Sequence, residues 1–171
     1  PPAVPARAHG AGAGRGSSTW DVIDGAGPSG PAVAVIDADG EHEGPGTAEM
    51  LAAQGRRVTL VTAFEFVGFS MNYLSRIGMM RRLIQAGVRL VTASAPRGFD
   101  GATLEIESLY GRTVERMAAD TVVLAGPNRA SAALADELRA SIADLHVIGD
   151  AYAPRKAAAA VHEGHRVGRA L

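Results

Sequence analysis

The sequence contains no cysteine among its 171 residues. Disulfides, thiolate nucleophiles and cysteine-held iron–sulfur clusters are therefore excluded within this chain. Long hydrophobic runs are also missing, and no segment reads as a membrane span or a signal peptide. The net charge is only −1, so the chain lacks the basic surface that nucleic acid or an acidic membrane would need. We expect a cytoplasmic protein that binds neither.

The residues that are present suffice for one ordinary folded core. The hydrophobic share is 47% and the charged share is 20%, which is typical of globular domains. The length also fits a single domain with a substantial interior. Because the chain starts at Pro1 without an initiator methionine, we interpret it as a fragment or a processed piece of a longer protein.

Strand-like and helix-like patterns alternate along most of the chain. Strands are predicted at residues 32–37, 57–62, 88–92, 121–125 and 145–148, and helices at 47–54, 73–86, 130–140 and from Pro154 onward. Residues 103–117 alternate polar and apolar side chains around a turn, which predicts an antiparallel hairpin or meander. The alternation predicts an α/β, Rossmann-like fold with a mainly parallel sheet and helices on both faces. Residues 33–37, 58–62, 88–91 and 122–125 should be central strands, buried on both sides.

One segment matches the G-x-G-x-x-G phosphate-binding pattern in letters but not in context. It spans residues 25–30. The pattern binds a pyrophosphate when a strand enters it and a helix leaves it, because the helix N-terminus holds the anion. Here a strand follows instead. We therefore interpret these glycines as a turn before the first strand.

The loop that follows the first strand, residues 37–46, has the correct position for a phosphate site. Its glycines are Gly40, Gly44 and Gly46, and its acids are Asp37, Asp39, Glu41 and Glu43. Four carboxylates repel a phosphate unless a cation offsets them. Two interpretations stay open: a weakened or lost nicotinamide-nucleotide site, or a solvated acidic loop whose glycines only turn the chain.

The end of the second strand lacks the usual acid that binds a ribose hydroxyl. Thr62 stands there, and Glu65 comes three residues later. No arginine lies nearby in the sequence to select a 2′-phosphate. The choice between NAD and NADP therefore stays open.

Metal-dependent alternatives find little support in the sequence. Paired acids after a strand, as in Asp37 and Asp39, are also typical of receiver domains of two-component signalling. Such a site needs a further Asp after the third strand, where residues 91–93 have none, and a lysine late in the sheet, whereas Lys156 follows the last predicted strand. His162 and His165 share a helix face without a third ligand. We predict no metal site and keep the receiver domain as a remote alternative.

Two strand ends in the C-terminal half offer further candidates for cofactor binding. Gly149, Asp150 and Ala151 follow a short β-branched run, and a helix predicted to start at Pro154 comes next. Such a junction places N–H groups near a phosphate and a carboxylate near a sugar hydroxyl. Gly126 follows another strand, where it either contacts a flavin nucleotide through its backbone or forms a tight turn capped by Asn128.

These segments resemble the C-terminal dinucleotide-binding (FAD/NAD(P)-binding) region of the old-yellow-enzyme-like NADH:flavin oxidoreductase family, in the branch of trimethylamine dehydrogenase and 2,4-dienoyl-CoA reductase. The resemblance rests on Gly149-Asp150, on the ending at residues 162–169, on the lead-in at residues 19–25 and on the irregular loop after the first strand. It implies an NAD(P)-binding-like second dinucleotide domain at 19–144 and the returning strand and helix of the FAD-binding domain at 145–171. Residues 1–18 are rich in Pro, Ala, Gly and Arg, which predicts a flexible linker.

The resemblance also implies a function and a set of partners. Members of the family carry an FMN barrel, an iron–sulfur cluster and two nested dinucleotide-binding domains, so the barrel, the cluster and the first domain's glycine loop would lie outside this chain. The expected role is electron transfer between a nucleotide cofactor and that barrel. We expect FAD or an ADP moiety shared with the missing domain, weak NAD(P)H binding, and no turnover or catalytic residue in the fragment itself. The alternative is a non-catalytic remnant that braces the enzyme or docks an electron-transfer protein.

Overall fold

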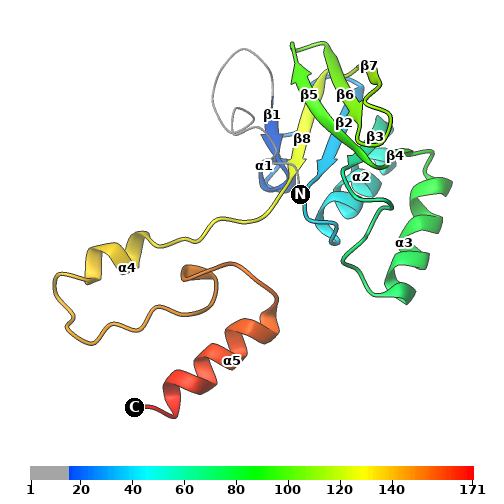
Figure 1. The fold of residues 1–171 in the computed structure, drawn as a ribbon. Helices are drawn as coiled ribbons and strands as arrows, with labels where there is room; N and C mark the ends of the chain where they lie inside the picture. The colour runs from blue at the N-terminus through cyan, green and yellow to red at the C-terminus, as the bar shows by residue number, and fades with distance from the viewer. Residues whose placement is uncertain (1–15) are drawn as a thin grey trace. The chain divides into compact units, whose positions relative to one another are not determined.

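The computed structural model describes residues 16–171 (Figure 1). The chain forms two compact units, Pro1–Gly126 and Pro127–Leu171. No helix in the described residues is both long enough and apolar enough to cross a lipid bilayer.

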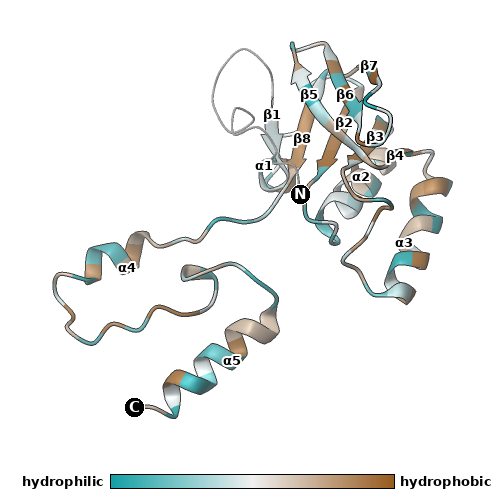
Figure 2. Cartoon of the chain, viewed as in Figure 1, coloured by the Kyte–Doolittle hydropathy of each residue, from teal (hydrophilic) through white to brown (hydrophobic). Residues whose placement is uncertain are grey.

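A five-stranded parallel sheet forms the centre of the first unit. Its strand order is β1–β8–β2–β3–β4. The strands are β1 (Gly16–Ser18), β2 (Ala32–Asp37), β3 (Arg57–Thr62), β4 (Arg89–Val91) and β8 (Thr121–Ala125). Asp37 pairs with Thr62 on one side and with Ala125 on the other, so β2, β3 and β8 end level at one edge of the sheet. The apolar residues of these three strands colour them brown in Figure 2.

The helices of the first unit are α1 (Thr19–Ile23), α2 (Glu43–Ala53) and α3 (Tyr73–Gln85). Side-chain caps define two of their starts, because an unpaired N–H in the first turn needs an acceptor. Ser18 and Asp21 form a capping box on α1. The Asn72 side chain accepts a hydrogen bond from the Ser75 N–H at the start of α3.

The two faces of the parallel sheet are covered differently. One face packs on the helices, in a cluster that includes Leu51, Leu60 and Leu83. The other face packs on a separate antiparallel sheet, in a cluster that includes Ile36 and Leu104. The predicted α/β class with a mainly parallel sheet is confirmed. The expectation of helices on both faces is wrong for this unit, because the chain passes from β4 into the antiparallel strands without a crossover helix.

The antiparallel sheet consists of β5 (Ser94–Phe99), β6 (Thr103–Ser108) and β7 (Val114–Ala118), in that order. The predicted antiparallel pair at 103–117 is confirmed, since β6 pairs with β7. Strand β5 was not predicted. It contains Pro96 and Gly98, and its register shifts between them, as expected for an edge strand.

Two predicted boundaries in this unit need correction. Strand β4 lies at the edge of the sheet, with Arg89 exposed, so the prediction of a central strand buried on both faces at 88–91 is wrong. Residues 16–18 form β1 and pair with β8, so a flexible linker cannot extend to Ser18. The rest of the predicted linker, residues 1–15, lies outside the described residues.

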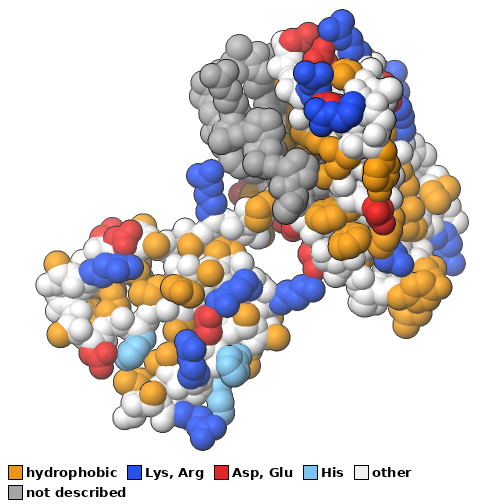
Figure 3. Space-filling view, viewed as in Figure 1, with side chains coloured by type: hydrophobic (Ala, Val, Ile, Leu, Met, Phe, Trp, Pro, Cys, Tyr) orange, Lys and Arg blue, Asp and Glu red, His pale blue; other side chains and the backbone are white. Residues whose placement is uncertain are grey.

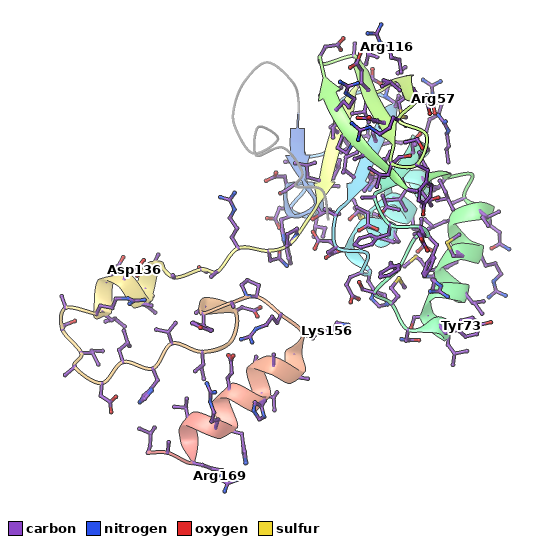
Figure 4. The ribbon with its side chains drawn as sticks, in the orientation of Figure 1. Arg57, Tyr73, Arg116, Asp136, Lys156 and Arg169 are labelled. Atoms are coloured by element: carbon purple, nitrogen blue, oxygen red, sulfur yellow. The ribbon has the colours of Figure 1, made fainter. Side chains whose placement is uncertain are left out.

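The second unit contains α4 (Ala133–Leu138), a 3-10 turn (Gly149–Ala151) and α5 (Ala157–Gly168). The strand predicted at 145–148 does not form, because no strand in the described part of this unit is present to pair with it. Helix α5 starts at Ala157 rather than at Pro154. Its N-cap residue, Lys156, has an extended backbone and is labelled at the start of the helix in Figure 4.

Candidate functional site

The strand order reverses between β2 and β8. From β2 the chain passes to β3 and β4 on one side, and β8 lies on the other side. In parallel α/β sheets, ligands bind at the carboxyl ends of the strands where the order reverses. At this position the Ala38 N–H donates to the carbonyl oxygen of Ala125 over 2.8 Å. A Cβ on Gly126 would lie 4.0 Å from the Cβ of Ala38. Gly126 is therefore next to the loop after β2.

This loop is short, because α2 begins at Glu43 rather than at residue 47 as predicted. Gly44 and Gly46 consequently lie in the first turn of α2. The Gly46 N–H donates to the His42 carbonyl, and Pro45 has no N–H. Only Glu43 and Gly44 can offer backbone donors to an anion in this first turn, so the helix N-terminus is a poorer phosphate site than usual.

Asp37, the last residue of β2, is buried with an exposed fraction of 1%. Its Oδ1 atom accepts a hydrogen bond from the Gly40 N–H at 3.0 Å. Its Oδ2 atom is buried and has no hydrogen-bond partner among the described residues. The pKa of Asp37 is raised to about 7, chiefly by burial and also by the nearby charge of Asp39, against the opposing Gly40 hydrogen bond. The carboxyl group therefore changes its protonation near neutral pH.

The other acids of the loop have internal contacts. Asp39 Oδ1 accepts from the Glu41 N–H at 2.9 Å, and Glu43 accepts from the Thr19 hydroxyl. His42 Nδ1 lies 3.6 Å from Glu41 Oε2. The interpretation of a wholly solvated acidic loop is therefore wrong for Asp37, and the remaining acids are partly buried. The described residues hold no group of three or more His, Cys, Asp or Glu side chains that could bind a metal ion.

Each of the three glycines in this loop has a different environment. Gly44 lies against Asp37, since a Cβ at residue 44 would be 2.8 Å from the Asp37 Cβ. Gly40 has φ +70°, and a Cβ there would be 3.1 Å from the Phe64 ring. Gly46 has no atom within 4 Å of the Cβ position. Only Gly46 therefore leaves space open for a ligand, whereas the other two are required by the fold.

A matched pair of alanine variants tests this difference. Gly44→Ala is expected to destabilise the chain by about 1–3 kcal/mol, because the added methyl group overpacks against Asp37. Gly46→Ala meets no neighbour and adds a better helix former, so its stability should stay equal or rise by about 0.5–1 kcal/mol. Urea unfolding of both variants measures the difference. Equal stabilities would contradict the packing of Asp37 against α2.

The end of β3 carries Thr62, which is buried and accepts a hydrogen bond from the Phe64 N–H at 3.3 Å. No acid takes the ribose position there, as the sequence indicated. Beyond it the rings of Phe64 and Phe69 stack at 5.1 Å. The Arg76 guanidinium lies 4.4 Å from the centre of the Phe66 ring. Sequence analysis missed this arginine because α3 brings it back to the loop from ten residues further along the chain.

The aromatic side chains after β3 are partly exposed. Phe66 and Phe69 are 39% and 48% exposed, and Tyr73 at the start of α3 is 65% exposed. Tyr73 is labelled in Figure 4, at the end of α3 nearest this loop. Hydrophobic side chains are visible on the surface of the first unit in Figure 3.

The glycine pattern at 25–30 lies between α1 and β2, at the amino end of β2. This position confirms that it is a turn before a strand. A Cβ on Gly30 would lie 2.4 Å from the Asp120 Cβ, and Asp120 Oδ2 accepts a hydrogen bond from the Ala32 N–H at 2.8 Å. The turn therefore serves the packing of β2 beside β8.

In the second unit, Glu163 of α5 holds the turn that contains the predicted Gly149, Asp150 and Ala151. Its Oε2 atom accepts from the Gly149 N–H at 2.8 Å, and its Oε1 atom pairs with Arg155. These contacts, with the Gly149 N–H first, lower the pKa of Glu163. Asp150 is exposed and makes no hydrogen bond or ion pair with the residues the structure describes. Sequence analysis did not identify Glu163, because nothing in the spacing marks it.

Comparisons with known proteins identify relatives that are oxidoreductases. No family model matches the chain. It is 27% identical over 177 residues to dimethylamine dehydrogenase from Hyphomicrobium sp. (strain x), covering 88% of this chain and 24% of that protein. It is 31% identical over 154 residues to NADH oxidase from Thermoanaerobacter brockii, covering 86% and 23%. The chain thus spans about a quarter of the length of these relatives.

A solved structure agrees with these relatives. The chain matches 6-hydroxypseudooxynicotine amine oxidase from Pseudomonas geniculata N1 with a TM-score of 0.84 and 26% identity. The match covers 90% of this chain and 24% of that one.

Proposed function

The chain belongs to the old-yellow-enzyme-like NADH:flavin oxidoreductase family, of which it covers a C-terminal part, and we propose that it serves such an enzyme as a dinucleotide-binding module. One observation carries the proposal. The direction in which successive strands are added to the parallel sheet reverses between β2 and β8, and Gly126 lies beside the loop that follows β2 at this edge. Nucleotides bind at this position in doubly wound sheets.

The module would orient cofactors rather than catalyse a reaction by itself. The cofactors supply the electron-transfer chemistry, and the protein supplies binding and electrostatics. We assign Gly40, Gly44, Gly46 and Gly126 to the nucleotide edge of the first unit. Gly149, Asp150 and Ala151 would complete a flavin or ADP site together with a dinucleotide domain outside this chain. The FMN barrel and the iron–sulfur cluster would also lie there, and an electron-transfer protein is a further candidate partner.

Nicotinamide nucleotides should bind only weakly. Pro45 removes one donor from the first turn of α2, the acids of the loop repel phosphate, and Thr62 cannot replace an acid at the ribose. These same features support the alternative, a module that only braces the enzyme. The open position beside Gly46 supports a residual site.

Calorimetric titration of the 171-residue chain with NADH and NADPH at pH 7.5 tests this proposal. We expect dissociation constants well above the micromolar range, or no measurable heat. A micromolar constant for either nucleotide would contradict the weakened site. Absence of binding by NADH, NADPH and ADP at both pH 6 and pH 7.5 would favour the bracing role instead.

A further inference from the structure

The buried carboxyl group of Asp37 lies beside the first turn of α2, where the pyrophosphate of a nucleotide would sit. Its side chain packs on Gly44, as the 2.8 Å approach at the Cβ position shows. One of its oxygen atoms is satisfied by the Gly40 N–H, and the other has no donor among the described residues. A buried acceptor without a donor is costly, so this group needs a proton, a ligand, or both.

Asp39, two residues further along the loop, does not supply this missing donor. Its Oδ1 atom accepts a hydrogen bond from the Glu41 N–H at 2.9 Å, and its charge disfavours the ionised form of Asp37. An ionised Asp37 therefore keeps one oxygen atom buried without a donor and close to a like charge. A proton on the Asp37 carboxyl group removes this buried charge.

We propose that the buried carboxyl group of Asp37, at the phosphate end of the nucleotide site, takes up one proton from solvent when a nucleotide binds. The added phosphates make the ionised form of Asp37 less favourable, so binding and protonation favour each other. This inference rests on the proposed nucleotide site. It explains how a loop rich in carboxylates can still admit an anion.

Each element packed against Asp37 contributes its own side chains to the surroundings of this carboxyl group. Strands β3 and β8 end beside it in Thr62 and Ala125, which do not titrate in this range. Helix α2 contributes Glu43, which accepts from Thr19. The loop contributes Glu41 and His42. Histidine is the one other kind of side chain that changes charge between pH 5 and 8, so His42 is the competing explanation for any pH dependence.

The test is calorimetric titration of the 171-residue chain with ADP-ribose at pH 6 and at pH 8, in two buffers of different ionisation enthalpy. The pyrophosphate diester of ADP-ribose keeps its charge over this range, whereas the terminal phosphate of ADP would itself titrate. With the Asp37 pKa at about 7, affinity should be about tenfold weaker at pH 8 than at pH 6. Near pH 7 the two buffers should reveal net proton uptake. This measurement on the unmodified chain needs no variant to fold.

Three variants identify the group responsible. Asp37→Asn should keep the hydrogen bond from Gly40 and abolish both the pH dependence and the proton uptake. His42→Gln should leave both unchanged. Asp100→Asn, in the turn between β5 and β6, controls for the loss of an acid elsewhere. If the affinity is equal at pH 6 and pH 8 and no proton is taken up, this proposal is wrong, although the nucleotide site itself stands. Loss of the pH dependence and of the proton uptake in His42→Gln would overturn it in the same way. No ADP-ribose binding at either pH overturns it together with the proposed nucleotide site.

Discussion

Replacing Asp37 with asparagine is expected to remove a pH dependence of stability that the natural residue confers. The pKa of Asp37 is raised from 3.8 to about 7 in the folded chain, chiefly by burial. Between about pH 4 and pH 7 the folded chain therefore holds a proton that the unfolded chain has released. Stability must fall as the pH rises through this window, by on the order of 4 kcal/mol in total.

The asparagine variant stays neutral at every pH. Its side-chain oxygen can accept the hydrogen bond from the Gly40 N–H. Urea unfolding at pH 5 and pH 7.5 should show that Asp37→Asn is more stable than the unmodified chain at the higher pH, and that the difference shrinks at the lower pH. Asp100→Asn should not show this pattern, because the N–H groups of Ala102 and Thr103 lower the pKa of Asp100. If the free energy of unfolding changed with pH by the same amount in Asp37→Asn and in the unmodified chain, Asp37 would be ionised in the folded state.

Asp150→Ala in the intact oxidoreductase should reduce flavin-nucleotide affinity by about ten- to hundredfold. Asp150 is exposed, and within the described residues it has no partner, so its carboxylate is free to accept hydrogen bonds from a ribose or ribityl hydroxyl. The loss of one such charge-assisted hydrogen bond costs about 1.5–3 kcal/mol. Flavin retention after dialysis, measured by absorbance, would report the change.

Asp144→Ala is the matched control for Asp150→Ala. Asp144 is an exposed acid of the same unit and lies 3.1 Å from His146 Nε2. Its loss should leave flavin retention unchanged, because it is not part of the turn that Glu163 holds. If Asp150→Ala retained flavin as well as Asp144→Ala does, Gly149-Asp150 would be a turn without a role in cofactor binding.

Local sequence patterns predicted the strands with continuous apolar character. Residues 32–37 and 57–62 match β2 and β3, because strands buried on both faces need such runs. The same logic failed at 145–148. A β-branched run forms a strand only beside another strand, and none is present in the described part of the second unit. Edge position also cannot be read from composition, so β4 was placed wrongly and β5, which contains Pro96, was missed.

The sequence predicted which segments form the candidate site but not the contacts between their side chains. The spacing identified the loop after β2 and Gly126, and the parallel sheet brings them together. It did not indicate that Gly44 accommodates Asp37, because that contact arises from the early start of α2. Arg76 and Glu163 were also missed, since each acts through a helix that returns it to a distant loop.

The most direct test of a nucleotide site at the β2–β8 edge is an NMR titration of the ¹⁵N-labelled chain with ADP at pH 6. The amide signals of Gly40, Gly44, Gly46 and Gly126 should shift together with one dissociation constant. Signals of the turn at 25–30, at the opposite edge of the sheet, should stay in place. Shifts confined to that turn, or no shift at saturating ADP, would contradict the nucleotide site.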